Sequence, residues 1–317
     1  MKSSILEPKK PKLFVNELLS LDERLVNVIH HVTIAAENLS LRVFLIGGVV
    51  RDILLKYPVS DLDILVEGDA IKLARHLSEC LNLSIRTYKP FHTATLFWSD
   101  GYRVDFAATR SEEYIHPGAL PKVCPSGLSE DIVRRDFTIN AMAISINRKD
   151  FGRLIDLCGG EADLRKKKIK VFHPNSFIDD PTRILRAVRF EQRFRFAMDS
   201  DTVRYLREAV KKNVFSSVKP PRIFAEFTKS LQEINVSTQL ARLTELTKLK
   251  FIPIKSRGKL MAVNRVACCL NRKNPSRINF DSNDLWKIYL LALLYREKNE
   301  DILLFIKKGS EYIIYEI

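Results

Sequence analysis

The sequence predicts an α+β fold in which a mixed-sheet head is followed by an all-helical neck and body. Between residues 42 and 147, short strand-like apolar runs alternate with helix-like segments. After about residue 160, convincing strand patterns disappear and helical periodicity takes over. The charge distribution changes along the chain as well, because the whole net charge of +14 lies after residue 150. The sequence therefore predicts a neutral head and a basic C-terminal half.

The order of elements in the head follows from its apolar spacing. Residues 13–38 carry apolar side chains at helical intervals and predict a leading helix. The predicted strands are 43–46, 62–66, 84–88, 93–98, 103–107 and 141–146, and the predicted helices among them are 49–56 and 69–81. Mixed spacing of this kind is typical of a mixed sheet flanked by a few helices.

The second half of the chain is predicted to be helical throughout. Its predicted helices are 180–195, 200–212, 220–234, 237–247, 258–270 and 283–297. The domains we expect are an N-terminal helical extension (1–40), a mixed-sheet head (41–150), and two helical regions (151–235 and 236–317).

Composition excludes several classes of protein. A chain of 317 residues with 46% hydrophobic and 28% charged residues is expected to be globular. No apolar run approaches the ~20 residues of a membrane span, and lysines at 9, 10 and 12 replace the apolar core of a signal peptide. The five cysteines form no Cys-x-x-Cys pair, which argues for reduced thiols and against a zinc site. We expect a cytoplasmic protein with no membrane partner.

The basic half indicates a polyanionic partner. Residues 151–235 and 236–317 each carry an excess of +7, whereas the preceding segments are neutral. An excess of this kind on one half favours binding of nucleic acid. The alternative is a surface that is basic only for solubility.

The most informative motif is Gly-Gly-x-x-Arg-Asp followed by Asp-x-Asp. Gly47 and Gly48 follow an apolar run and would let backbone N–H groups approach a phosphate. Arg51 can grip phosphate oxygens with its planar guanidinium. Asp61 and Asp63 lie two residues apart on one face of a strand, so both can bind one Mg²⁺. Separately, each piece is typical of a turn or a strand end, but together they indicate metal-dependent nucleotidyl transfer.

A further carboxylate and a second motif extend this set. Asp105 lies on an alternating strand, where it is either a general base or second-metal ligand, or an ordinary surface carboxylate. Arg134, Arg135 and Asp136 precede an apolar segment and are candidates for a triphosphate clamp. Asn140 is either a buried organiser or a turn residue.

The third motif, Asp-Asp-Pro-Thr-Arg-Ile-Leu-Arg-Ala-Val-Arg-Phe, covers 179–190. Asp180 is predicted as the N-cap of a helix whose first residue is Pro181. Ile184, Leu185 and Val188 are expected to face the core. Arginines at 183, 186 and 189 would then form a slanting stripe from the end of the helix that favours anions.

Asp180 and Arg183 also suggest how a base is chosen without a template. Cytosine and adenine each present an exocyclic amine beside an unprotonated ring nitrogen. An Asp can accept a hydrogen bond from the amine while an Arg donates to the ring nitrogen. Uracil and guanine present a carbonyl and an N–H instead, so both contacts would fail.

These three motifs, in this order and spacing, resemble the class II tRNA nucleotidyltransferase and poly(A) polymerase family over residues 42–235. The resemblance implies a polymerase-β-like nucleotidyltransferase head (41–150), a neck that reads the base and binds RNA (151–235), and a helical body with a shortened tail (236–317). It implies that Asp61 and Asp63 hold Mg²⁺, and that a tRNA 3′-hydroxyl attacks the α-phosphate of CTP or ATP to release pyrophosphate. The residues expected to contact the nucleotide are Gly47, Gly48, Arg51, Arg135, Asp136, Asp180, Arg183, Arg186 and Arg189.

Three departures from the family pattern stand out. His92 stands where relatives commonly carry Gly, which is expected to crowd the sheet edge. Asp179 replaces a common Glu, and the tail that grips the far part of the tRNA is expected to be short or missing. Residues 108–131 retain a loop that CC-adding members tend to lack, so complete CCA addition is favoured.

Addition of A alone is the next choice. Addition of CC alone and poly(A) synthesis remain alternatives. An alternative that is not an enzyme is a basic RNA-binding protein with an inactive head. The intact Asp61 and Asp63 argue against this alternative.

Overall fold

The computed structural model describes residues 12–248, which fall into two compact units. Of these residues, the first unit holds 12–113 and Lys122–Lys166, and the second holds Tyr114–Pro121 and 167–248. The predicted helices 258–270 and 283–297 lie outside the described residues. The four-part division expected from the sequence stays a prediction.

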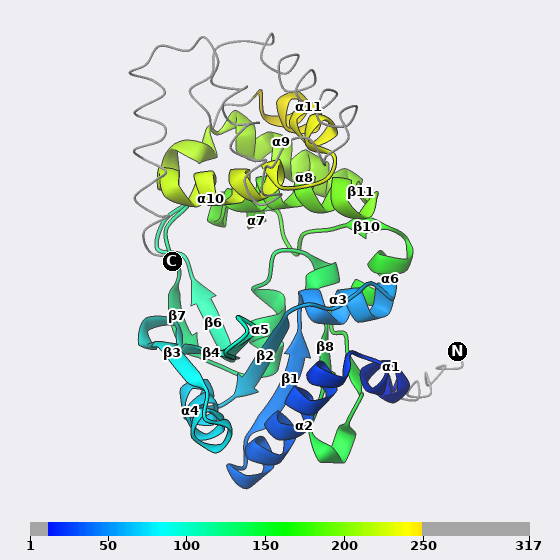
Figure 1. Ribbon diagram of the computed structural model, residues 1–317. Coiled ribbons are helices and arrows are strands. Elements are labelled where there is room, and N and C mark those ends of the chain that lie inside the picture. The colour runs from blue at the N-terminus through cyan, green and yellow to red at the C-terminus, as the bar shows by residue number, and fades with distance from the viewer. Residues whose placement is uncertain (1–11, 249–317) are drawn as a thin grey trace, which may run out of the picture. The chain divides into compact units, whose positions relative to one another are not determined.

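A mixed sheet lies in the first unit (Figure 1), as the sequence predicts, but it has seven strands because the short β9 (Leu154–Ile155) joins the six that were predicted. Its strands, in spatial order, are β3 (Ser84–Tyr88), β4 (Thr93–Phe97), β5 (Arg103–Ala108), β2 (Leu62–Glu67), β1 (Arg42–Ile46), β8 (Ala143–Ser145) and β9. Strands β2 and β5 run parallel, and every other neighbouring pair of this sheet is antiparallel.

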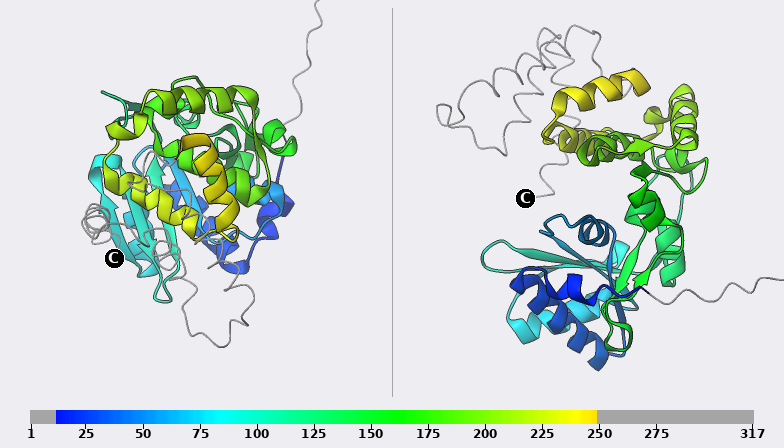
Figure 2. Two further views of the ribbon diagram at one scale, coloured as in Figure 1. Left: turned by 90° about the horizontal axis from the view of Figure 1, so that it is seen from above. Right: turned by 90° about the vertical axis from the view of Figure 1, so that its right-hand side faces the viewer.

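Helices α2 (Glu23–Asn38) and α4 (Ala70–Leu81) lie side by side against one face of this sheet (Figures 1 and 2). Asp22 and Asp69 cap their N-termini by accepting hydrogen bonds from Arg24 N and Lys72 N. Along β2, Leu62 and Ile64 are buried while Asp63 between them is exposed. Because side chains alternate along a strand, the sheet buries its apolar face and presents its carboxylates on the other.

Three local differences from the predicted head have physical reasons. The leading helix is interrupted, since α1 (Val15–Leu19) ends at Ser20 before Asp22 caps α2. The predicted strand 141–146 is shortened to β8 because Thr138–Asn140 forms a 3₁₀ turn. A hairpin of β6 (Arg110–Glu113) and β7 (Lys122–Pro125) was not predicted, since its strands are polar and show no alternation.

The remaining helices of the first unit are short, and those of the second unit are longer except for α7. The first unit adds α3 (Gly48–Leu55), α5 (Leu128–Val133) and α6 (Gly160–Arg165), and the second contains α7 (Ser176–Asp179), α8 (Thr182–Phe194), α9 (Ser200–Lys211), α10 (Pro220–Leu231) and α11 (Val236–Thr247). None of the helices within residues 12–248 is long and apolar enough to cross a membrane.

Helix α8 lies at the core of the second unit. The predicted core residues Ile184, Leu185 and Val188 are fully buried, as expected. The all-helical prediction needs one correction, because β10 (Lys168–Ile169) and β11 (Ala197–Met198) form a small parallel pair. Two-residue strands are too short to produce a sequence pattern.

Helix α6 provides a test of the close packing in the first unit. Gly159 has a positive φ of 75° and open space around it, whereas a Cβ on Gly160 would collide with the backbone oxygen of Thr138. We expect Gly160→Ala to lower the free energy of unfolding by about 3 kcal/mol. Gly159→Ala should cost about 1 kcal/mol, the penalty for a left-handed conformation. Urea denaturation followed by circular dichroism measures both, and equal losses would contradict this packing.

Candidate active site

Two predicted carboxylates face one another across parallel strands. Asp63 on β2 and Asp105 on β5 are register partners, so their side chains project from the same face of the sheet. Asp61 precedes β2 by one residue and accepts a hydrogen bond from Ser60 Oγ at 3.0 Å. Thr95 Oγ1 donates to Asp105 Oδ1 at 2.5 Å from the neighbouring strand β4. The strand register therefore brings Asp105 to the Asp-x-Asp motif, which the sequence alone left open.

The proximity of these charges alters the pKa of Asp63. Its side chain reaches solvent, but the surrounding protein desolvates the carboxyl, and the charge of Asp105 adds to this, so its pKa rises to about 6. Arg135 opposes the rise, and Asp61 adds to it. Because the folded-state pKa is raised, the group stabilises the fold at low pH, and this contribution is lost as pH rises through about 6. A cation bound beside Asp63 would favour its ionised carboxylate and so lower this pKa.

The donor set fits a hard cation that shares its coordination with a substrate. Among residues 12–248, no group of three or more His, Cys, Asp or Glu side chains is arranged to hold a metal. Mg²⁺ is usually held by one or two carboxylates, with substrate phosphates and water completing its six ligands. The oxygens of Asp61 and Asp63 match that requirement better than an all-protein metal cage.

The Gly47-Gly48 turn lies between the end of β1 and the start of α3. Gly47 has φ 73° and ψ −122°, a conformation that side chains with a Cβ rarely adopt. A Cβ at Gly47 would stand 3.2 Å from Arg135 Nη1, and one at Gly48 would stand 3.5 Å from Arg51 Nη2. Gly47 thus leaves room for the guanidinium of Arg135, whereas a Cβ at Gly48 would make only an ordinary contact with Arg51.

Arg51 is held in place by a network that the sequence analysis did not resolve. Its guanidinium donates to both carboxylate oxygens of Asp52 at 2.9 Å, and its Nη1 donates to Asn140 Oδ1 at 2.7 Å. Asn140 Nδ2 in turn donates to Asp136 Oδ1 at 3.1 Å. Asn140 is therefore a buried organiser, and Asp136 supports it.

The tandem arginines share one buried partner. Asp131, which is fully buried, accepts hydrogen bonds from Arg134 Nη2 at 2.7 Å and from Arg135 Nη2 at 2.8 Å. Arg134 also binds Glu112 at 2.7 Å, whereas Arg135 is the one that reaches Gly47. The spacing of Asp131 to the arginines, i to i+3 and i+4, was the signal that could have identified it.

The third motif lies in the second unit, where α8 begins one residue later than predicted, so that its N-cap position is Pro181 and not Asp180. Helix α8 begins at Thr182, and Asp180 Oδ1 accepts from Thr182 N at 3.1 Å and from its Oγ1 at 2.6 Å. Pro181 precedes the helix instead of forming its first residue. Asp180 Oδ2 pairs with Arg222 Nη2 at 3.0 Å.

The predicted arginine stripe is largely internal. Arg183 and Arg189 are each only 6% exposed. Arg189 Nη2 donates to Glu226 Oε2 on α10 at 3.0 Å, and Arg186 Nη1 reaches Glu226 Oε1 at 3.4 Å. These contacts join α8 to α10, and the expected role of Arg186 and Arg189 toward a triphosphate stays a prediction.

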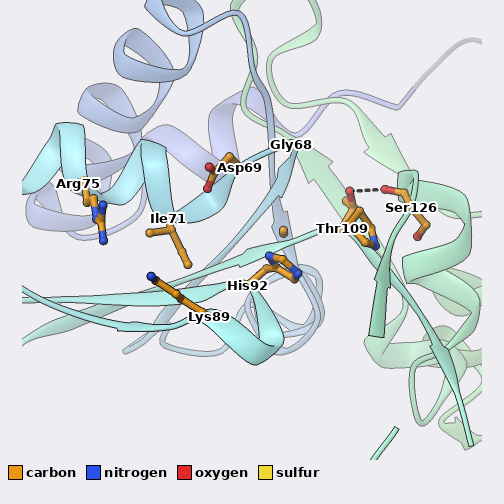
Figure 3. A pocket seen from close by; sticks show the side chains of 10 residues that line it. Gly68, Asp69, Ile71, Arg75, Lys89, His92, Thr109 and Ser126 are labelled. Carbon is orange, nitrogen blue, oxygen red and sulfur yellow. Dashed lines mark hydrogen bonds between the residues drawn. The ribbon is translucent and has the colours of Figure 1, made fainter. Parts of the chain in front are cut away.

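A pocket of about 750 Å³ lies elsewhere in the first unit and contains none of the predicted site residues. Arg75 on α4, Lys89 and His92 are among its lining residues (Figure 3). His92 has φ 50°, a left-handed conformation that favours glycine, and its side chain is exposed. The physical cost of His at this position is therefore backbone strain and not crowding of the sheet edge.

The chain is similar to known proteins in sequence and in fold. Residues 43–170 match the family model described as the Poly A polymerase head domain. The A-adding tRNA nucleotidyltransferase of Aquifex aeolicus is 47% identical over 61% of this chain and 23% of its own length. The corresponding protein of Halalkalibacterium halodurans is 37% identical over 67% of this chain and 50% of its own length. The chain thus spans about a quarter to a half of these curated relatives.

Solved structures match over more of the chain. A tRNA-processing enzyme in an apo form aligns with a TM-score of 0.80 and 33% identity, over 92% of this chain and 75% of that one. A tRNA nucleotidyltransferase complexed with a primer tRNA and an incoming ATP analog aligns with a TM-score of 0.75 and 35% identity, over 88% and 79%. With matches of this extent and with the motifs in place, the chain belongs to the class II tRNA nucleotidyltransferase and poly(A) polymerase family.

Proposed function

We propose that this protein adds nucleotides to the 3′ end of tRNA, and specifically the terminal adenosine from ATP. The observation that carries the proposal is the register pairing of Asp63 with Asp105 beside Asp61. A cluster of carboxylates on one face of a sheet is suited to Mg²⁺-dependent phosphoryl chemistry. The Gly47-Gly48 turn and the guanidinium of Arg135 lie beside one another, as phosphate binding requires.

In the proposed reaction the 3′-hydroxyl of tRNA attacks the α-phosphate of ATP, and pyrophosphate leaves. Asp61 and Asp63 would hold Mg²⁺, which when bound stabilises negative charge on the phosphate oxygens. Asp105, which accepts a hydrogen bond from Thr95, would take the proton of the attacking hydroxyl or assist the metal. Arg51 and Arg135 would hold the triphosphate beside the glycine turn.

Choice of base is assigned to Asp180 and Arg183. Asp180 remains an acceptor for an exocyclic amine because its ion pair with Arg222 leaves lone pairs on Oδ2. Arg183 lies in the first turn of α8, three residues further along the chain. Adenine and cytosine satisfy such a pair, whereas guanine and uracil leave both groups without partners.

The higher sequence identity of the A-adding relatives favours addition of adenosine over complete CCA addition. The A-adding enzymes of three organisms are 37–47% identical to this chain, whereas a CC-adding enzyme and multifunctional CCA proteins are 30–32% identical. Complete CCA addition is the second candidate. It is supported by a CCA-adding enzyme structure that aligns over 94% of this chain with a TM-score of 0.81.

Three tRNA transcripts, ending at the discriminator base, at C and at CC, test the proposal when incubated with Mg²⁺ and labelled ATP or CTP. We expect ATP to extend only the CC-ended transcript and CTP to extend none. Asp63→Asn should reduce the rate by on the order of 10³-fold, because it removes a metal ligand. Asp201→Asn, an exposed acid on α9, is the matched control and should have no effect.

Other outcomes of this assay would assign other functions. Extension of all three transcripts to CCA would identify a complete CCA-adding enzyme. Binding of tRNA without incorporation of either nucleotide would favour the inactive RNA-binding protein. Incorporation that survives Asp63→Asn would contradict the metal site.

Arg183→Ala tests the base-reading pair. We expect the preference for ATP over UTP to fall roughly 5- to 150-fold, which is the discrimination that a pair of hydrogen bonds to one base provides. Stabilisation by Mg²⁺ in thermal unfolding should be unchanged, because the carboxylates are intact. Arg193→Ala, which removes an arginine of the same helix paired with Glu233, is the control. An unaltered rejection of UTP would show that Arg183 does not read the base.

A further inference from the structure

Arg222, in the first turn of α10, connects two parts of the second unit. Its Nη2 pairs with Asp180 Oδ2 at 3.0 Å. Its Nη1 donates to the carbonyl oxygens of Gly118 at 2.9 Å and of Ala119 at 3.5 Å. Gly118 and Ala119 belong to the tip of the β6–β7 hairpin, Tyr114–Pro121, which is part of the same unit. One guanidinium thus bridges this hairpin tip and the proposed base-reading carboxylate.

The contacts of Asp180 fix the orientation of its carboxylate plane. Oδ1 is held by the backbone N and the hydroxyl of Thr182, and Oδ2 is held by Arg222. A carboxylate anchored at one oxygen alone can rotate, since the terminal torsion of Asp is broad. Anchoring the second oxygen removes that freedom, and Oδ2, which pairs with Arg222 alone among these groups, still has acceptor capacity for another donor.

The hairpin tip is in turn fastened to its surroundings. Gly118 N donates to the carbonyl oxygen of Asp179 at 3.1 Å, next to Asp180. Gly118 has φ 69°, and a Cβ there would stand 2.6 Å from the backbone oxygen of Ser217. The tip therefore packs so closely that only glycine fits, and its carbonyls present a fixed target to Arg222.

We propose that Arg222 is a specificity-determining positioning residue that orients Asp180 toward the amine of the incoming base, and that the hairpin tip holds Arg222 in place. This inference rests on the proposed function. A guanidinium suits the role because its fork of donors reaches acceptors in different directions, whereas an ammonium acts as a single charge. Arg222 acts through Asp180 and need not touch the substrate.

The first test compares Arg222→Met and Arg222→Lys with wild-type protein. We expect Arg222→Met to lower the ratio of kcat/KM for ATP over GTP about 10-fold or more, within the range of one base contact. The rate with ATP itself should fall less, because the carboxylates of the first unit are untouched. Arg222→Lys should restore part of the ratio. Arg204→Met, an exposed ion-paired arginine on α9, is the control.

A double-mutant cycle tests the role of the hairpin tip. Gly118→Ala should lower the same ratio, and combining it with Arg222→Met should add no further loss, since both act through one contact. Gly159→Ala, with a similar φ but open space, should leave the ratio unchanged. Losses that multiply in the double variant would overturn the link from the tip to Arg222. An unchanged ratio in folded Arg222→Met, verified by its unfolding midpoint, would overturn the whole proposal.

Equilibrium binding of ATP and GTP without tRNA separates this inference from the proposed function. If wild-type protein adds no nucleotide but binds ATP more tightly than GTP, and Arg222→Met loses that preference, the inference stands and the proposed function fails. If wild-type protein shows no preference in binding or in incorporation, the inference is overturned as well.

Discussion

The free-energy cost of ionising Asp63 is the constraint on which the candidate site in the first unit depends. Desolvation by the surrounding protein is the largest cause of this cost, and the parallel register of β2 and β5, which sets Asp63 beside Asp105, adds charge repulsion. Arg135 and Arg103 partly offset the cost, and the buried Asp131 fixes Arg135 in turn. Charges of both signs thus surround Asp63.

In the second unit, buried ion pairs fix the orientation of the charged side chains. Glu226 on α10 binds two arginines of α8, and Arg222 one turn earlier binds Asp180. Because breaking a buried pair leaves an uncompensated charge, such pairs define one arrangement of the two helices. Arginines that a sequence pattern predicts to bind a ligand can thus form ion pairs within the protein instead.

The sequence predicted the elements of the site better than the connections among them. Gly47, Asp61 and Asp63 stand out in the sequence because close backbone approach and shared metal ligation would require particular residues at short spacing. The pairing of Asp63 with Asp105 was not, because register between distant strands has no local signal. The partner of Arg189 lies 37 residues away, so its burial could not be read from helix periodicity. The same holds for Asn140, whose partner Arg51 is 89 residues away.

The central claim is that the clustered carboxylates are poised to bind a divalent cation, and proton release on metal binding tests it most directly. Mg²⁺ would be titrated into the protein at pH 6 and pH 8 by calorimetry, in buffers of different ionisation enthalpy. With a pKa of about 6 for Asp63, we predict release of about half a proton per ion at pH 6 and almost none at pH 8. Asp63→Asn should abolish the release. Binding without proton release at pH 6, or release that persists in Asp63→Asn, would contradict the account.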